Sequence, residues 1–171
     1  LKAWAMAGSK DSRSNDAIPI CGVGASAGGV SALKDFFAAL PADLGLAFVV
    51  VMHLPDDQSS MLDEIVARAT DMTVRQVDDQ LRFEPDTVYV IAPDRELVIE
   101  DGTLSAHPHS AERGKRAPID VFFRSIADMG EDAIAVVLSG AGADGSVGVR
   151  AVKEAGGLVL VQDPDEAEFP S

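Results

Sequence analysis

The chain has 171 residues, of which 47% are hydrophobic, and its formal net charge is −14 at pH 7. This length and composition predict one domain with a core large enough to fold without disulfides or metals. The acidic charge argues against a nucleic acid as partner, since binding to phosphates requires a basic surface.

The apolar runs and the cysteine content narrow the class of protein further. No run approaches the ~18 residues of a membrane span, so no insertion into a membrane is expected. The single cysteine, Cys21, cannot form an intrachain disulfide, which favours a reducing, cytoplasmic setting. Residues 1–17 join a short apolar stretch without a basic flank to a polar stretch, and we interpret them as a disordered tail or tag remnant.

Strands and helices alternate from Ile18 onwards. A first apolar strand begins there and runs into a turn of Gly and Ala residues that carries Ser26. Leu46–Met52 and Ala133–Leu138 are continuous apolar runs, as in parallel strands buried on both faces, and a last strand ends at Val161. Apolar residues at helical spacing predict four helices, in chain order Val30–Leu40, Gln58–Thr70, Pro118–Met129 and Ser146–Ala155.

The middle of the chain departs from this rhythm. It contains four short, partly alternating runs, namely Thr73–Val77, Thr87–Ile91, Glu96–Glu100 and Thr103–Ala106. Asp101-Gly102 between the last two runs is a strong hairpin signal, and residues 105–117 are predicted to form a polar loop. The fold class is therefore α/β, a doubly wound, mostly parallel sheet flanked by helices, with an antiparallel hairpin insertion.

Three of the predicted strands end at turns that carry Ser26, His53 and Asp144. A serine hydroxyl needs a histidine to accept its proton, and an aspartate fixes the histidine's tautomer. Taken singly, each residue has a structural explanation, such as Asp144 as a helix cap. Together, at the carboxyl ends of parallel strands, they predict a catalytic triad, with the backbone N–H groups of Ala27 and Ala141 as oxyanion donors.

The first turn has a competing interpretation as a nucleotide-binding loop. Gly22-x-Gly24-x-x-Ala27 satisfies the dinucleotide-binding fingerprint with Ala in its last place. That fingerprint expects an acidic residue at the end of the second strand to bind the ribose, and Met52 and His53 stand there instead. No Gly-Lys-Ser/Thr follows the glycines either, so the sequence favours catalysis over nucleotide binding.

The polar loop offers two further clusters. His107 and His109 have no cysteine or carboxylate at ligand spacing, so no metal site is predicted, and no cofactor is expected. Arg113, Lys115 and Arg116 form a local basic cluster in an acidic chain. A solvated loop explains this cluster better than contact with an acidic protein partner does.

The motifs around the three predicted catalytic residues resemble those of one enzyme family. They are Gly24-Ala-Ser-Ala-Gly-Gly29, Met52-His-Leu-Pro55 and Ser139-Gly-Ala-Gly-Ala-Asp-Gly145. In this order they resemble the catalytic domain of chemotaxis protein-glutamate methylesterases, the CheB family, over roughly residues 18–165.

The resemblance implies hydrolysis of γ-glutamyl methyl esters on the cytoplasmic helices of chemoreceptors, with release of methanol, and deamidation of selected glutamines. Ser26 would be the nucleophile, His53 the general base and acid, and Asp144 the orienting partner. Family members often carry Thr and Met where this chain has Ala27 and Ala141, so oxyanion binding would rest on backbone N–H groups here. The alternative is a non-catalytic regulatory or interaction domain whose triad residues do not assemble.

The resemblance also sets expectations about domain organisation. Residues 46–53 and 156–164 are most similar to forms fused to a receptor methyltransferase, so the usual phosphorylation-receiver domain is not expected upstream of Ile18. The family continues into a further Met-Pro-containing segment beyond Ser171. Residues 18–171 are therefore expected to be a methylesterase catalytic domain that is truncated at its C-terminus.

Overall fold

The computed structural model describes residues 18–26, 29–52, 61–109, 116–138 and 143–167. Its main feature is a six-stranded sheet with the strand order β3-β5-β2-β1-β8-β9. In that order the strands are β3 (Thr73–Val77), β5 (Thr87–Ile91), β2 (Ala47–Met52), β1 (Ile20–Ala25), β8 (Ala133–Val137) and β9 (Leu158–Val161). All neighbouring strands pair in parallel, which confirms the predicted parallel sheet.

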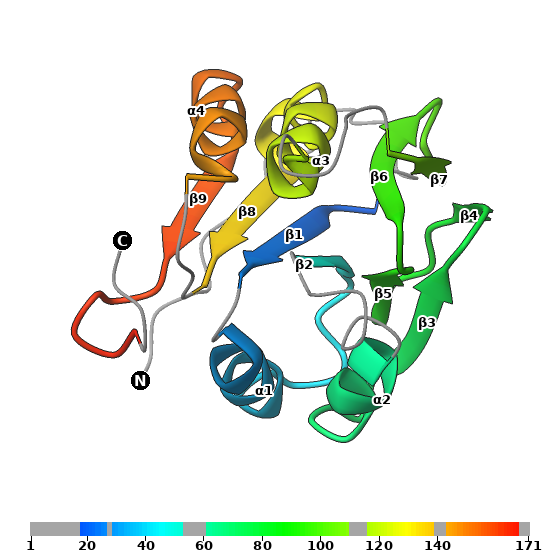
Figure 1. Cartoon of the computed structure of the whole chain (residues 1–171), viewed down its shortest axis with the longest axis vertical. Coiled ribbons are helices and arrows are strands. Elements are labelled where there is room, and N and C mark those ends of the chain that lie inside the picture. The colour runs from blue at the N-terminus through cyan, green and yellow to red at the C-terminus, as the bar shows by residue number, and fades with distance from the viewer. Residues whose placement is uncertain (1–17, 27–28, 53–60, 110–115, 139–142, 168–171) are drawn as a thin grey trace, which may run out of the picture.

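Helices cover both faces of this sheet. One face carries α1 (Gly29–Ala38) and α2 (Leu62–Ala67), and the other carries α3 (Pro118–Ala127) and α4 (Ser146–Glu154) (Figure 1). Each face has its own apolar core, because alternate residues of a strand point to opposite sides. The fold is therefore doubly wound, as predicted. None of the helices in the described ranges is long and apolar enough to cross a membrane.

A second, smaller sheet contains the predicted hairpin. Its order is β4-β7-β6, with β4 (Gln80–Arg82), β6 (Arg95–Glu100) and β7 (Thr103–Pro108) all antiparallel. Asp101 and Gly102 both have positive φ, 50° and 71°, as a two-residue hairpin turn with the right-handed twist requires. The hairpin insertion is confirmed.

Two of the four short runs do not belong to this insertion. Thr73–Val77 and Thr87–Ile91 are β3 and β5 of the main parallel sheet. β3 is an edge strand and is largely exposed, which explains its polar residues. β5 is buried throughout. The sequence left open which sheet these two runs join, because edge position depends on strand order, which sequence periodicity does not encode.

Local differences concern short elements. β4 was not predicted, because a three-residue, mostly exposed strand has no detectable period. β7 runs to Pro108, inside the segment predicted as a loop, since it pairs with β6 over its whole length. α2 covers only Leu62–Ala67 of the predicted helix, whose residues 58–60 lie outside the described ranges.

Candidate active site

Ser26 lies in a tight turn between a buried strand and a helix. It follows β1 directly and is half-buried. Its carbonyl oxygen accepts a hydrogen bond from the N–H of Gly29, the first residue of α1, at 2.8 Å. Ser26 thus lies at the carboxyl edge of the sheet, where open α/β folds place their reactive groups. Ala27 lies outside the described residues.

Asp144 is fixed in place by the first turn of α3. Its Oδ2 accepts the backbone N–H of Ile119 at 3.1 Å, and its Oδ1 accepts that of Asp120 at 2.9 Å. These are two of the donors that a helix leaves without intrahelical partners at its N-terminus. Ala117, at the N-cap position of α3, has no side chain that can accept these N–H groups. Asp144 therefore caps α3 from another part of the chain.

The helix-cap explanation of Asp144 is therefore correct in kind but concerns a different helix. The sequence suggested a cap on the helix that follows Asp144, namely α4. The N-cap of α4 is Gly145, with φ of 101° and no side-chain hydrogen bond. Asp144 instead bonds to α3, some 25 residues earlier in the chain.

Sheet register brings the ends of three strands to one edge. β1 and β8 pair up to Gly24 and Val137, and the N–H of Leu138 then donates to the carbonyl of Gly24 at 2.9 Å. β1 and β2 pair up to Ala25 and Met52. His53 follows Met52 in the sequence but, like Ala141, it lies outside the described residues.

Ile119 links the turn of Ser26 to the turn of Asp144. A Cβ on Gly24 would lie 2.6 Å from Ile119 Cγ2, and a Cβ on Gly145 would lie 3.0 Å from the same methyl group. One side chain at the N-terminus of α3 thus contacts residues that precede Ser26 and follow Asp144. The two predicted catalytic residues accordingly belong to one compact region.

This region is the topological switch point of the sheet. β2, β5 and β3 lie on one side of β1, and β8 and β9 lie on the other. At such a reversal, the connections leave neighbouring strands in opposite directions and open a crevice at their carboxyl ends. Ser26 follows β1 and Asp144 follows β8 in the chain, so both residues lie beside the switch point.

The two glycines of the dinucleotide fingerprint have a packing role. Gly22 and Gly24 lie within β1, not in the turn, and face α3. A Cβ on Gly22 would lie 2.9 Å from Phe122 Cε1, so any larger residue would collide with the aromatic side chains of α3. The glycines allow close helix–strand packing, which explains the motif without a nucleotide.

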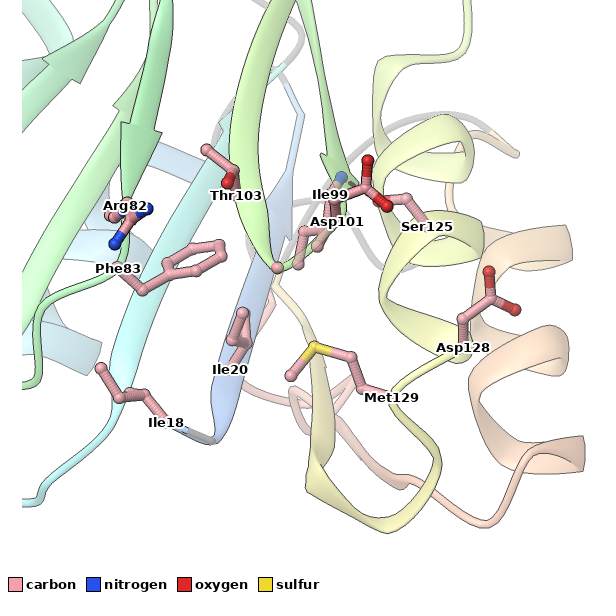
Figure 2. Close-up of a pocket in the computed structure, with 11 residues that line it drawn as sticks. Ile18, Ile20, Arg82, Phe83, Ile99, Asp101, Thr103, Ser125, Asp128 and Met129 are labelled. Carbon is pink, nitrogen blue, oxygen red and sulfur yellow. Dashed lines mark hydrogen bonds between the residues drawn. The ribbon is translucent and has the colours of Figure 1, made fainter. Parts of the chain in front are cut away.

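A cavity of about 570 Å³ lies at the opposite end of β1 (Figure 2). Apolar and polar residues from several elements line it: Ile18, Ile20, Arg82, Phe83, Ile99, Asp101, Gly102, Thr103, Ser125, Asp128 and Met129. Ile20 begins β1 and Ser26 follows its end, so this cavity is separate from the switch point.

The two histidines and Arg116 of the polar segment lie close to carboxylates. Across the hairpin, His107 Nε2 lies 3.2 Å from Glu100 Oε2, and His109 Nδ1 lies 3.9 Å from Glu96 Oε2. Carboxylates thus do lie near both histidines, contrary to the expectation from sequence spacing. Even so, no group of three possible metal ligands occurs within the described part of the chain. Arg116 bonds to Asp94 at 3.0 Å, while Arg113 and Lys115 lie outside the described residues.

Sequence reasoning missed Asp120. Its Oδ1 accepts the N–H of Gly148 in α4 at 2.7 Å, while its own N–H donates to Asp144. An acidic residue in the first turn of a helix is commonly explained by the helix dipole, so the sequence held no signal for a contact to another helix.

Fold and site together define a doubly wound α/β domain with a serine and an aspartate at the carboxyl edge of its switch point. Residues 21–171 match the protein family described as CheB methylesterase. The chain is a member of this CheB methylesterase family, and the resemblance seen in the motifs is confirmed.

Known proteins of this family match most of the chain. A putative protein-glutamate methylesterase/protein-glutamine glutaminase of Leptospira interrogans is 34% identical over 149 residues, which are 86% of this chain and 77% of that protein. A protein-glutamate methylesterase/protein-glutamine glutaminase of Maricaulis maris is 31% identical over 84% of this chain. The crystal structure of the Thermotoga maritima CheB methylesterase catalytic domain superposes with a TM-score of 0.81 at 26% identity, covering 90% of this chain and 84% of that one.

The relatives differ in how much of their length this chain spans. It covers 77% of the Leptospira protein, but 37% of the Maricaulis protein and 11% of an uncharacterized 104.1 kDa protein of Rhodobacter capsulatus. The matched region is therefore one domain within several larger proteins.

Proposed function

We propose that this domain is a protein-glutamate methylesterase with Ser26 as nucleophile, His53 as general base and acid, and Asp144 as the partner that orients the imidazole. The observation that supports this most directly is the contact of Ile119 with both Gly24 and Gly145, which holds the turns of Ser26 and Asp144 together at the switch point. The register of β1 and β2 also favours the role of His53, which follows the residue paired with Ala25.

The reaction proceeds in two steps, acylation of Ser26 and hydrolysis of the acyl-enzyme. The Oγ of Ser26 bonds to the ester carbonyl carbon while its proton passes to His53; the bond to the methoxy group then breaks and methanol leaves with that proton. Water next attacks the acyl-enzyme, gives a proton to His53, and releases glutamate as Ser26 regains its hydrogen. Backbone N–H groups of Ala27 and Ala141 stabilise the oxyanion in both steps.

The substrates proposed are methylated glutamates on the cytoplasmic helices of chemoreceptors, which requires a cytoplasmic location. Relatives named protein-glutamine glutaminase also favour deamidation at the same site. Attack on a glutamine amide gives the same acyl-enzyme and releases ammonia instead of methanol, so no additional residue is needed. We further propose that residues 18–171 form the catalytic domain and that a methyltransferase domain is fused to it in the whole protein.

Replacing the nucleophile tests this function. Ser26→Ala is expected to lower the release of methanol from methylated receptors by about 10⁴-fold or more, since the covalent route is lost. Ser31→Ala, an exposed serine in α1, is the matched control and should retain the full rate. The rate is measured as radiolabelled methanol from receptors carrying labelled methyl esters.

A fluorophosphonate probe separates the enzyme from a non-catalytic interaction domain. Labelling of Ser26 requires an activated hydroxyl, so the proposed triad predicts stoichiometric labelling in the wild type and none in Ser26→Ala. A folded wild-type protein without labelling, or a Ser26→Ala variant with full methanol release, would overturn the proposed function.

A further inference from the structure

Asp120 makes two hydrogen bonds to the segment that runs from Asp144 into α4, one as a backbone donor and one as a side-chain acceptor. It is the third residue of α3 and is half-buried. Its backbone N–H donates to Asp144 Oδ1 at 2.9 Å, and its own Oδ1 accepts the N–H of Gly148 at 2.7 Å. Gly148 is the third residue of α4, which begins two residues after Asp144. Asp144, which precedes α4, therefore caps α3, and Asp120, which lies in α3, caps α4.

Hydrogen bonds make the segment from Asp144 to α4 a single unit. The N–H of Ser146 donates to the carbonyl of Ala143 at 3.3 Å, and the N–H of Val149 donates to that of Gly145 at 2.8 Å. The hydroxyl of Ser146 also donates to the carbonyl of Ala143, at 2.7 Å. Because these bonds tie Asp144 to the first turn of α4, whatever fixes that turn against α3 also fixes the carboxylate of Asp144.

Packing brings α3 and α4 together but is not directional. A Cβ on Gly148 would lie 2.5 Å from Phe123 Cβ and 3.1 Å from the carbonyl oxygen of Asp120, so the two helices approach each other closely at this glycine. Apolar contacts of this kind set a distance, whereas a hydrogen bond between a carboxylate and an N–H also sets direction. The Asp120–Gly148 bond is the directional contact at this approach.

We infer that Asp120 is a positioning residue for ester hydrolysis: by bonding the N-terminus of α4 to α3, its carboxylate sets the place of the Asp144 carboxylate. This inference rests on the proposed function, in which Asp144 orients the imidazole. It adds a fourth residue to the site, one that touches no substrate.

The first test is a kinetic comparison of Asp120 variants. Asp120→Ala is expected to lower kcat about 10- to 100-fold with KM nearly unchanged, because small misplacement of a catalytic group slows chemistry more than binding. Asp120→Asn keeps an oxygen acceptor for the N–H of Gly148 and should restore most of the rate. Asp128→Ala, at the exposed far end of the same helix, is the matched control and should leave kcat unchanged.

A double-mutant cycle distinguishes positioning from a general structural role. If Asp120 acts through Asp144, then adding Asp120→Ala to Asp144→Ala lowers the residual rate less than about twofold, since the group that it positions is already absent. A structural role alone would lower the rate by the same factor in both backgrounds. The number of fluorophosphonate-reactive sites should stay at the wild-type value in Asp120→Ala, which shows that the folded fraction is unchanged.

The outcomes separate the inference from the function beneath it. Wild-type kcat in Asp120→Ala, together with strongly lowered rates in Ser26→Ala and Asp144→Ala, would overturn the inference and leave the methylesterase function intact. Full activity in Ser26→Ala would overturn the function itself. If Asp120→Ala does not fold, Asp120→Ser, whose side chain is one bond too short to reach Gly148 in the same way, replaces it in the same tests.

Discussion

At the scale of single residues, the carboxylate of Asp144 combines an observed helix cap with a proposed catalytic role. Both oxygens of Asp144 accept N–H groups from the first turn of α3. A carboxylate oxygen can accept more than one hydrogen bond, so capping α3 leaves capacity for the N–H of an imidazole. Two backbone donors also hold the carboxylate in a fixed direction, which a group that orients a histidine requires.

Cys21 illustrates how burial decides reactivity at this scale. The thiol is 3% exposed, and burial raises its pKa from 9.0 to about 12. At pH 8 the native protein then holds about 10⁻⁴ of the thiol as thiolate, the form that attacks disulfide reagents. We expect no reaction with Ellman's reagent in the native state and rapid reaction in urea, with Cys21→Ala as the blank. Rapid, stoichiometric reaction of the folded protein would contradict this.

The same shift of pKa has a consequence for stability at alkaline pH. The folded state favours the neutral thiol, so this contribution to stability is complete below about pH 9 and is lost as the pH rises toward about 12. The free energy of unfolding should therefore fall more steeply with pH above 9 in the wild type than in Cys21→Ala. Equal slopes for the two proteins would contradict the assignment.

At the scale of elements, the site depends on how closely α3 approaches β1. Gly22 and Gly24 leave room for Phe122 and Ile119, and the N-terminus of α3 thereby reaches the edge where Ser26 lies. The alternation of the strand places Cys21, Val23 and Ala25 in the other core, beneath α1. A single strand thus carries small residues for one helix and larger ones for the other.

Gly24→Ala tests this close approach. The new Cβ would lie 2.6 Å from Ile119 Cγ2, so the variant is expected to lose about 1–3 kcal/mol in free energy of unfolding from overpacking. Ile119→Ala removes that methyl group, and the double variant should be more stable than the two single effects predict. Ile119→Val keeps Cγ2 and serves as the control without rescue. Additive effects in urea unfolding for Gly24→Ala with Ile119→Ala would show that the collision is not the cause.

At the scale of the whole molecule, strand order decides where chemistry can occur. The chain adds strands on one side of β1 first and on the other side later. This places the carboxyl ends of the parallel strands β1 and β8 side by side, although they are far apart in the sequence. The cavity at the other end of β1, lined by Ile20, lies away from this edge. The net charge of −14 is also a property of the whole molecule. Repulsion among the excess acidic groups destabilises the compact state.

This charge predicts stabilisation by salt. Raising NaCl from about 10 mM to about 0.15 M shortens the Debye length from ~30 Å to ~8 Å and screens repulsion among the carboxylates. We expect a gain of about 1 kcal/mol, or a rise of roughly 2–4 °C in Tm, in thermal unfolding followed by circular dichroism. A fall in Tm would show that exposed ion pairs such as Arg75–Glu84, bonded twice at 3.0 Å, outweigh the repulsion. Glu84→Gln, which breaks that pair, is the matched variant.

The sequence by itself determined the family, the fold class, the helices on both faces of the sheet and the buried strands. These features follow from local periodicity and from motifs within short segments. The catalytic roles of Ser26, His53 and Asp144 and the oxyanion roles of Ala27 and Ala141 stay predictions. Of these residues, His53, Ala27 and Ala141 also lie outside the described ranges. Only the tertiary structure decided that Thr73–Val77 and Thr87–Ile91 join the main sheet, that Asp144 caps α3, and that Asp120 binds α4. The physical reason is that these features are contacts between segments distant in the chain, and strand order and helix packing, not local preference, choose such partners.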